Sequence, residues 1–346
     1  MASEFNLIEK YFTRATPQAN LGVGDDAALI SISQGMQLAV STDMLVAGTH
    51  FFHDAAPYDI GWKALAVNVS DMAAMGAQPK WATLAIALPQ ILPSPAQEEG
   101  QDGGQRNAPT PALSLKEGGL IDENWLAEFS RGFFACAGQF KVDLIGGDTT
   151  RGPLNISVTI MGEVPKNQAL KRDGAQADDD IWVSGNLGSA AAGLAHLQGK
   201  LTLKNELYAC LSALHTPTPR SALGLALRGI ANSCIDVSDG LLADLGHILK
   251  ASNLGATIDL EKVPCIACLK NDLNNVEIQQ LLLAGGDDYE LCFTAPKGKN
   301  EAIKMLSKQL GLPLSNIGNI RMDIGLQACY KNNNLEIYKK GFDHFE

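Results

Sequence analysis

Short clusters of aspartate with glycine, serine or threonine recur along the chain. Nine aspartates belong to them, and several follow apolar runs that predict strands: Asp25, Asp26, Asp43, Asp71, Asp148, Asp236, Asp239, Asp287 and Asp288. Carboxylate oxygens on tight turns suit Mg²⁺, which prefers oxygen ligands and bridges to phosphate oxygens. Folding alone requires no such density of acids. The clusters therefore predict a protein that handles phosphate groups through several metal ions rather than through lysines.

The clusters differ in how well an ordinary structural role explains them. Gly24–Asp26 could form a common turn. Ser41–Asp43 is more informative, because two hydroxyls and a carboxylate offer three oxygens at one predicted strand end. Asp71 belongs to an otherwise apolar helix, where a buried carboxylate is costly unless it is paired or bound to metal. Recurrence at predicted strand ends, where α/β proteins bind ligands, favours a common site.

Two further clusters carry signals of a different kind. Asp148 follows Gly146 and Gly147, and glycine lets a backbone approach a ligand closely. Asp236–Asp239 repeats the Val-Ser-Asp order of Asn68–Asp71. Either duplicated halves or two unrelated helix N-caps explain this repeat.

Common nucleotide-binding and hydrolase motifs are absent from the sequence. It contains no Walker A loop, no complete dinucleotide fingerprint and no Gly-x-Ser-x-Gly elbow. His50 has no partners at zinc-site spacing, so packing or a substrate hydrogen bond is its expected role. Arg172 lies beside a charged stretch, which is typical of a solvated side chain.

Length, charge and cysteine content restrict the class of protein. The 346 residues predict two α/β domains, 1–161 and 162–346. The net charge of −11 disfavours nucleic acid and anionic membranes as partners, and bound divalent cations would reverse the local sign for an anionic substrate. Seven scattered cysteines argue against a disulfide framework and favour the cytoplasm. No secretory signal or bilayer-spanning apolar run is evident.

The predicted elements alternate and favour α/β or α+β layers. Strands are expected at Met36–Thr42, Val142–Ile145, Asn155–Val164 and Tyr289–Thr294. Helices are expected at Lys63–Met75, at Ser189–Leu197 and, after the stretch Ile235–Asp239, at Leu241–Ala251. The Pro- and Gly-rich stretch 93–119 has almost no large apolar residue and predicts a mobile surface loop without chemistry.

Taken together, the clusters resemble the thiamine-monophosphate kinases of the AIR-synthetase-like superfamily. The stretches that carry the resemblance are GVGDDAAL (22–29), STDMLVAGTHF (41–51), KALAVNVSDMAAMGAQP (63–79), LIGGDTTRGPL (144–154), DVSDGLLADLGHI (236–248) and GGDDYELCF (285–293). The resemblance implies a two-domain α/β fold. In the first domain it implies a sheet that pairs with its two-fold mate and closes a barrel in a homodimer.

The resemblance also implies a reaction, the ATP-dependent transfer of one phosphoryl group to thiamine monophosphate (TMP), the last step of thiamine diphosphate biosynthesis. It assigns several Mg²⁺ ions to Asp26, Ser41, Thr42, Asp43, Asp71, Asp148, Asp236 and Asp239. It assigns ATP to Gly147, Asp148, Arg172 and Ser238, and TMP to His50, Asp287 and Phe342. It leaves a K⁺ requirement open.

This chemistry agrees with the residues themselves. A phosphate monoester has a second pKa of about 6, so TMP is largely dianionic at neutral pH and needs no general base. The obstacle is repulsion between two polyanions, which several Mg²⁺ ions would overcome by neutralising and aligning the phosphates. We expect Asp43, Asp71 and Asp148 to form the central cage and carry catalysis.

Three features depart from the family pattern, and two alternatives stay open. The usual Gly-Gly-Glu-Asp has the shorter Asp287 in place of Glu, which could need a bridging water, and Phe342 can stack but cannot donate a hydrogen bond. The 93–119 insert is also atypical. One alternative is another ATP-using enzyme of the superfamily. The other is a non-catalytic divalent-cation-binding module, although its regular Asp-x-Asp-x-Asp-Gly loop is absent.

Overall fold

The chain folds into two compact units. The computed structural model describes residues 4–89, 91–92, 121–336, 338 and 341–342. Unit 1 comprises Met1–Ser31, Thr42–Asn68 and Lys80–Ile160, and unit 2 comprises Ile32–Ser41, Val69–Pro79 and Met161–Glu346. The loop predicted at 93–119 lies outside the described residues.

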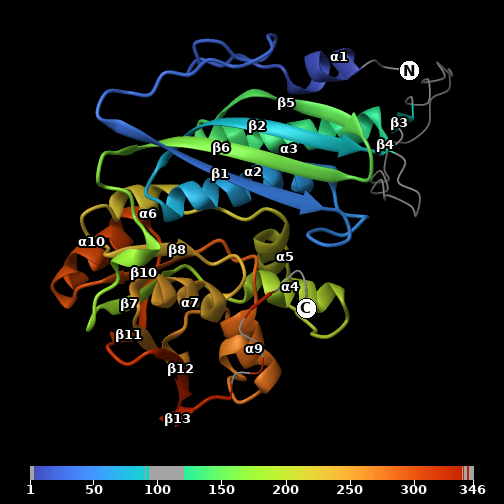
Figure 1. The fold of residues 1–346 in the computed structure, drawn as a ribbon. Helices are drawn as coiled ribbons and strands as arrows, with labels where there is room; N and C mark the ends of the chain where they lie inside the picture. Colours follow the sequence, from blue (N-terminus) through green and yellow to red (C-terminus); the bar gives the residue numbers. More distant parts are fainter. Residues whose placement is uncertain (1–3, 90, 93–120, 337, 339–340, 343–346) are drawn as a thin grey trace. The chain divides into compact units, whose positions relative to one another are not determined.

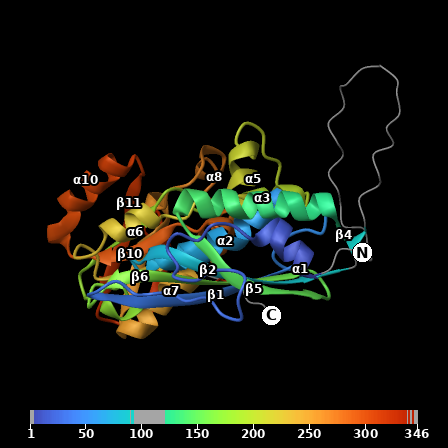
Figure 2. The same ribbon diagram turned by 90° about the horizontal axis from the view of Figure 1, so that it is seen from above.

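A four-stranded sheet in the order β1-β6-β2-β5 forms most of unit 1, although residues 36–41, 78–79 and 161–165 of its strands belong to unit 2. Its strands are β1 (Met36–Val46), β2 (Gln78–Leu88), β5 (Asp143–Arg151) and β6 (Asn155–Pro165). The helices α2 (Pro57–Ala74) and α3 (Glu123–Phe140) lie on the same face of this sheet (Figures 1 and 2). Shorter elements are α1 (Glu4–Leu7), a π-helical turn (Ile8–Phe12) and the paired strands β3 (Ile91–Leu92) and β4 (Ile121–Asp122).

The sequence of α3 explains both its start and its buried face. Asp122 caps the N-terminus by accepting a hydrogen bond of 2.8 Å from the Trp125 N–H. Trp125, Phe129 and Phe133 follow one another at four-residue intervals, so their rings share one helix face, where they are buried and stacked. Lys141 ends the helix in the left-handed conformation with φ 57°.

A seven-stranded sheet in the order β13-β12-β9-β11-β7-β10-β8 organises unit 2. Its strands are β7 (Asp180–Ser184), β8 (Ser233–Asp236), β9 (Gly255–Asp259), β10 (Leu291–Ala295), β11 (Leu314–Arg321), β12 (Gly325–Tyr330) and β13 (Asn333–Asn334). Its helices are α4 (Ser189–Leu197), α5 (Leu207–His215), α6 (Ser221–Ala226), α7 (Leu241–Ser252), α8 (Ala267–Lys270), α9 (Val276–Ala284) and α10 (Asn300–Leu310). Short 3-10 turns occupy Arg172–Gly174, Leu260–Lys262 and Lys297–Lys299.

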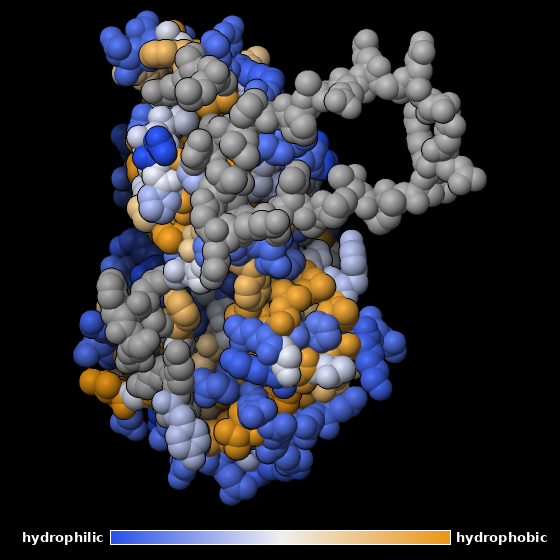
Figure 3. Space-filling model, turned by 90° about the vertical axis from the view of Figure 1, so that its right-hand side faces the viewer, coloured by the Kyte–Doolittle hydropathy of each residue, from blue (hydrophilic) through white to orange (hydrophobic). Residues whose placement is uncertain are grey.

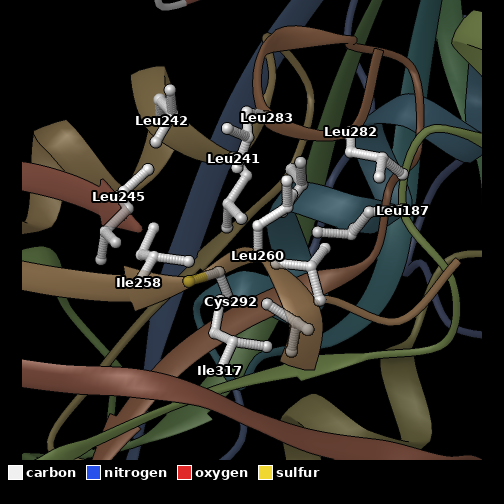
Figure 4. Packing of buried hydrophobic residues seen from close by; sticks show 14 of the residues in the cluster. Leu187, Leu241, Leu242, Leu245, Ile258, Leu260, Leu282, Leu283, Cys292 and Ile317 are labelled. Carbon is white, nitrogen blue, oxygen red and sulfur yellow. The ribbon is translucent and has the colours of Figure 1, made fainter. Parts of the chain in front are cut away.

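Alternating side chains of the central strands fill two apolar clusters in unit 2. Ile181 and Val183 of β7 belong to one cluster, whereas Trp182 between them belongs to the other. On β10, Cys292 and Phe293 divide in the same way. Since successive strand residues point to opposite faces, the clusters lie on the two faces of the sheet. Figure 4 shows the first cluster, in which leucines of α7 and α9 pack near sheet residues.

The layers of helices and sheets confirm the predicted α/β class, but some strand boundaries differ. β1 runs on to Val46 and β5 to Arg151, so Asp43 and Asp148 lie within strands instead of after them. Both are outer strands of their sheet, where a polar side chain can face solvent. The strand predicted from Tyr289 begins only at Leu291, because Tyr289 has φ 50°, outside the β region.

The surface mixes apolar and polar side chains, as in most folded proteins. On the face shown in Figure 3, apolar surface (orange) is interspersed with hydrophilic surface (blue). Exposed apolar side chains include Leu38, Val40 and Met44 of β1. Among the helices of the described residues, none combines the length and the apolar character needed to cross a membrane.

Candidate functional site

The loop between β8 and α7, residues 237–240, joins segments that are distant in the sequence. Its carbonyls accept three backbone hydrogen bonds of 2.8 to 3.0 Å: Val237 from Tyr289, Ser238 from Asp287 and Asp239 from Phe342. Gly286 permits this approach, because a Cβ there would lie 2.4 Å from the Ser238 carbonyl oxygen. The structure therefore brings together Ser238, Asp239, Asp287 and Phe342, which the sequence predicted for ATP, Mg²⁺ and TMP.

Asp244, in the first turn of α7, holds the same loop from inside the protein. Its Oδ2 accepts hydrogen bonds of 3.0 Å from the N–H groups of Ser238, Asp239 and Gly240. Burial, followed by the charges of Asp236 and Asp239, raises the pKa of Asp244 to about 8, whereas the hydrogen bonds from the Asp239 and Gly240 N–H groups lower it. Sequence reasoning missed Asp244. Its only sequence signal is an acid within an apolar helical turn.

Asp71 and Asp236 form a close acidic pair in unit 2. Asp71 accepts a hydrogen bond from the Ser41 hydroxyl, and Asp236 is buried. Burial and then the charge of Asp71 raise the pKa of Asp236 to about 7, whereas Ser70 and Arg172 lower it. The structure thus links four predicted residues: Ser41 donates a hydrogen bond to Asp71, and the charges of Asp71 and Arg172 both act on Asp236. Two carboxylates this close repel each other unless a proton or a bound cation neutralises one of the charges.

The oxygen atoms around this pair fit a hard cation. Two carboxylates and the hydroxyls of Ser41 and Ser70 supply only oxygen donors, the ligand type that Mg²⁺ prefers. Ser70 Oγ is buried beside Asp236 without the geometry of a formed hydrogen bond. Within the described ranges, no three His, Cys, Asp or Glu side chains are placed to hold one metal ion. Phosphate oxygens and water would therefore complete the coordination, as is usual for Mg²⁺.

Other predicted residues lie in unit 1, on β1 and in the loops next to it. Asp26 is exposed in the loop that precedes β1. Thr42 shares a hydrogen bond of 2.8 Å with the hydroxyl of Thr159 on β6. His50 Nδ1 accepts a hydrogen bond of 3.0 Å from the Val46 N–H, so a neutral His50 ring keeps Nε2 as a donor.

Asp43 and Asp148 lie on opposite edges of the four-stranded sheet. Asp43 belongs to β1 and Asp148 to β5, and β6 and β2 run between them. Neighbouring strands are about 4.8 Å apart, so three spacings separate the two outer strands by about 14 Å. A single Mg²⁺ with ligand distances of about 2 Å does not reach both. One copy of the sheet therefore does not bring these two predicted ligands together.

Gly147, next to Asp148, occupies a position that only glycine fits. Its φ is 155°, and a Cβ would lie 1.9 Å from the Leu84 carbonyl oxygen on β2. We expect Gly147→Ala to lower the free energy of unfolding by about 2 to 4 kcal/mol, because the two strands must move apart. Urea denaturation measures the loss, and kinetics at varied ATP concentration measure its effect on turnover.

Gly138→Ala is the matched control for this variant. Gly138 is exposed on α3, and no atom lies within 4 Å of its added Cβ. Alanine there should be neutral or stabilise the protein by up to about 1 kcal/mol, because it favours the helix. Equal stability of the two alanine variants would contradict the close approach at Gly147.

Two further acids anchor the 285–290 segment: Asp288, which belongs to a predicted aspartate cluster, and Glu290, which sequence reasoning missed. Asp288 accepts a hydrogen bond of 2.7 Å from the Gly188 N–H, just before α4. Glu290 is buried and forms an ion pair with Arg220 at 2.5 Å. An acid directly before a mostly apolar strand was the available sequence signal for Glu290. These contacts hold the segment that carries Asp287.

Comparison with known proteins defines the class to which this fold and site belong. Residues 24–164 match the AIR synthase related protein N-terminal domain, and residues 176–326 match the AIR synthase related protein C-terminal domain. The fold is therefore that of a two-domain AIR synthase related protein.

More specific similarity places the chain within this class. It is 42% identical to the thiamine-monophosphate kinase of Salmonella typhimurium, over 99% of this chain and 98% of that protein. The crystal structure of thiamine-monophosphate kinase from Stenotrophomonas maltophilia K279a is 45% identical, with a TM-score of 0.76 and coverage of 90% and 91% of the two chains. The structure of AaThiL complexed with AMPPCP and TMP is 28% identical, with a TM-score of 0.71 and coverage of 91% and 89%. The chain belongs to the thiamine-monophosphate kinase family, which confirms the resemblance of its motifs.

Proposed function

We propose that this protein phosphorylates thiamine monophosphate with ATP and forms thiamine diphosphate and ADP. The observation that carries the proposal is the meeting of Ser238, Asp239, Asp287 and Phe342 at the 237–240 loop. These residues meet in a chain that is 42% identical to a thiamine-monophosphate kinase over nearly its full length. AaThiL binds AMPPCP, an ATP analogue, together with TMP, which supports ATP as the donor.

The acceptor phosphate needs positioning more than activation. At neutral pH the TMP phosphate is largely a dianion, and one of its oxygens forms the new bond to the γ-phosphorus of ATP. The bond from that phosphorus to the β,γ-bridging oxygen breaks, and ADP leaves with the electron pair. Bound Mg²⁺ would supply the positive charge that lets the two polyanions approach.

The proposed roles of the residues follow the two units. In unit 2, Ser41, Asp71, Asp236 and Asp239 hold Mg²⁺, Arg172 and Ser238 contact ATP, and Asp287 and Phe342 contact TMP. In unit 1, Asp26, Thr42, Asp43 and Asp148 hold Mg²⁺, Gly147 contacts ATP, and His50 contacts TMP. K⁺ as a further bound cation is also part of this proposal. The domain boundary between residues 161 and 162 is likewise proposed.

We also propose that the protein acts as a homodimer in the cytoplasm. The outer strand β1 exposes Leu38, Val40 and Met44, and a second sheet paired against it would cover this apolar surface. The cytoplasmic location is supported by the seven cysteines, all of which are described and are free thiols.

The test of the reaction supplies ATP, Mg²⁺ and TMP and follows thiamine diphosphate by chromatography. We expect equal amounts of ADP and thiamine diphosphate, and no product with free thiamine, because it lacks the phosphate dianion. Excess EDTA should slow the reaction by at least about 100-fold, since the carboxylates alone repel both substrates. Added Mg²⁺ should restore the rate.

Each alternative predicts a different outcome of this assay. Undiminished turnover in EDTA would contradict a role for divalent cations. Metal binding without ATP consumption would favour a non-catalytic cation-binding module. ATP consumption that ignores TMP would favour another ATP-using enzyme of the AIR-synthetase-like class.

A further inference from the structure

Tyr289 and Asp287 lie side by side in a segment with an unusual backbone. The Tyr289 hydroxyl donates a hydrogen bond of 2.9 Å to Asp287 Oδ1. We propose that Tyr289 is a positioning residue, which sets the Asp287 carboxylate for TMP binding. This inference rests on the proposed function, because it needs Asp287 to contact TMP.

The backbone of both residues is held in the left-handed region. Asp287 has φ 66° and Tyr289 has φ 50°. For side chains other than glycine this region is unfavourable, most of all for a bulky residue such as tyrosine. Such conformations persist only where the surroundings enforce them, and they concentrate at functional sites. Asp287 and Tyr289 flank a single residue, so two such conformations occur within three positions. This indicates that the site requires defined directions for the Asp287 and Tyr289 side chains.

Backbone hydrogen bonds enforce this conformation from one side. The Asp287 N–H donates to the Ser238 carbonyl at 2.8 Å, and the Tyr289 N–H donates to the Val237 carbonyl at 2.9 Å. In the opposite direction, the Val237 N–H donates to the Glu290 carbonyl at 2.8 Å. The segment is therefore fastened to the same loop that carries Ser238.

Side chains of the alternate residues fasten the segment from the other side. Asp288 accepts a hydrogen bond of 2.7 Å from the Gly188 N–H. Glu290 accepts hydrogen bonds from the Ser184 hydroxyl at 2.5 Å and from Arg220 Nε at 2.7 Å. Because Asp288 and Glu290 are held in this way, the intervening Tyr289 has little freedom to move.

The burial of Tyr289 gives its hydroxyl a defined direction. The residue is 8% exposed, whereas Asp287 is more accessible. A buried tyrosine hydroxyl keeps a polar partner, because an unpaired hydroxyl is costly. The hydrogen bond therefore links an accessible carboxylate to a buried, immobile ring. It limits the positions that the carboxylate can adopt before a substrate arrives, which lowers the ordering cost of binding.

The test compares Tyr289→Phe with Tyr11→Phe in the full-length protein. Tyr11 is also buried, and its hydroxyl donates to Glu123 at 3.2 Å, so the control removes the same kind of contact in unit 1. We expect Tyr289→Phe to raise the KM for TMP by about 10-fold, the effect of one hydrogen bond to a charged group. The KM for ATP and kcat should stay within about 2-fold, and Tyr11→Phe should leave all three constants unchanged.

A double-mutant cycle with Asp287→Asn separates positioning from packing. If the hydroxyl acts through the Asp287 carboxylate, Tyr289→Phe should have little further effect on the KM for TMP in the Asp287→Asn background. An unchanged KM for TMP in Tyr289→Phe overturns the inference. Equal increases in both KM values also overturn it, because they indicate a general loss of structure. A wild-type protein that forms no thiamine diphosphate would instead refute the proposed function, and the inference with it.

Discussion

Asp71→Asn is expected to reduce turnover by roughly 10³-fold, the equivalent of about 4 kcal/mol of lost stabilisation at the metal site. Asp71 lies beside the buried Asp236 and accepts a hydrogen bond from Ser41. Asparagine has nearly the same shape and can still accept that hydrogen bond, but it brings no charge to a cation. The fold should persist, because removal of one charge relieves the repulsion that raises the pKa of Asp236.

Measurement of kcat together with calorimetric titration of Mg²⁺ in the presence of ATP checks this result. Asp323→Asn is the matched control, because it removes the charge of an exposed aspartate between β11 and β12. That variant should keep wild-type turnover and Mg²⁺ uptake. Turnover of Asp71→Asn within a few-fold of the control, or unchanged Mg²⁺ uptake, would remove Asp71 from the proposed metal site.

Asp244→Ala should have the second largest effect, because it removes the acceptor of three backbone hydrogen bonds at once. The N–H groups of Ser238, Asp239 and Gly240 all donate to Asp244 Oδ2. Without this acceptor, the three N–H groups lose their partner, which should lower the free energy of unfolding by about 2 to 4 kcal/mol and kcat/KM by about 100-fold. Urea denaturation and steady-state kinetics measure the two losses.

Two companion variants make this result interpretable. Asp244→Asn keeps a carbonyl oxygen that can accept hydrogen bonds from the same N–H groups, so the asparagine variant should retain most stability. Asp259→Ala removes the acceptor of a single backbone N–H, that of Glu261, and a partly exposed ion pair with Lys262, and should cost about 1 kcal/mol without loss of activity. If Asp244→Ala loses no more activity than Asp259→Ala, the 237–240 loop does not depend on Asp244 for its position.

Local patterns predicted many of the elements well. α4 spans Ser189–Leu197 and α7 begins at Leu241, both as expected from their sequences. β6 begins at Asn155, where alternation of apolar residues begins. These features depend on neighbours within a few residues, so their signals are present in a short stretch of chain.

Features that depend on distant segments escaped prediction. The left-handed backbone of Tyr289 is enforced by Val237 and by the anchors of its neighbours, and nothing in its own stretch signals it. In the sequence, Asp244 is one acid of an ordinary helix. The structure shows that three backbone N–H groups donate hydrogen bonds to it. The strands that hold Asp43 and Asp148 extend beyond the predicted ends, because pairing with neighbouring strands carries them through these polar residues.

The chemistry could be inferred from the residues alone, because residue type sets which ions and groups a side chain can bind. Its aspartates and hydroxyls specify oxygen ligands for a hard cation, and its motifs specify the family. Which of these acids meet depends on the tertiary structure. It placed Asp71 beside Asp236, set Asp43 and Asp148 on opposite edges of one sheet, and fastened Asp287 to Ser238. Strand order and long-range hydrogen bonds arise when distant segments pack together, and no short stretch of sequence contains them.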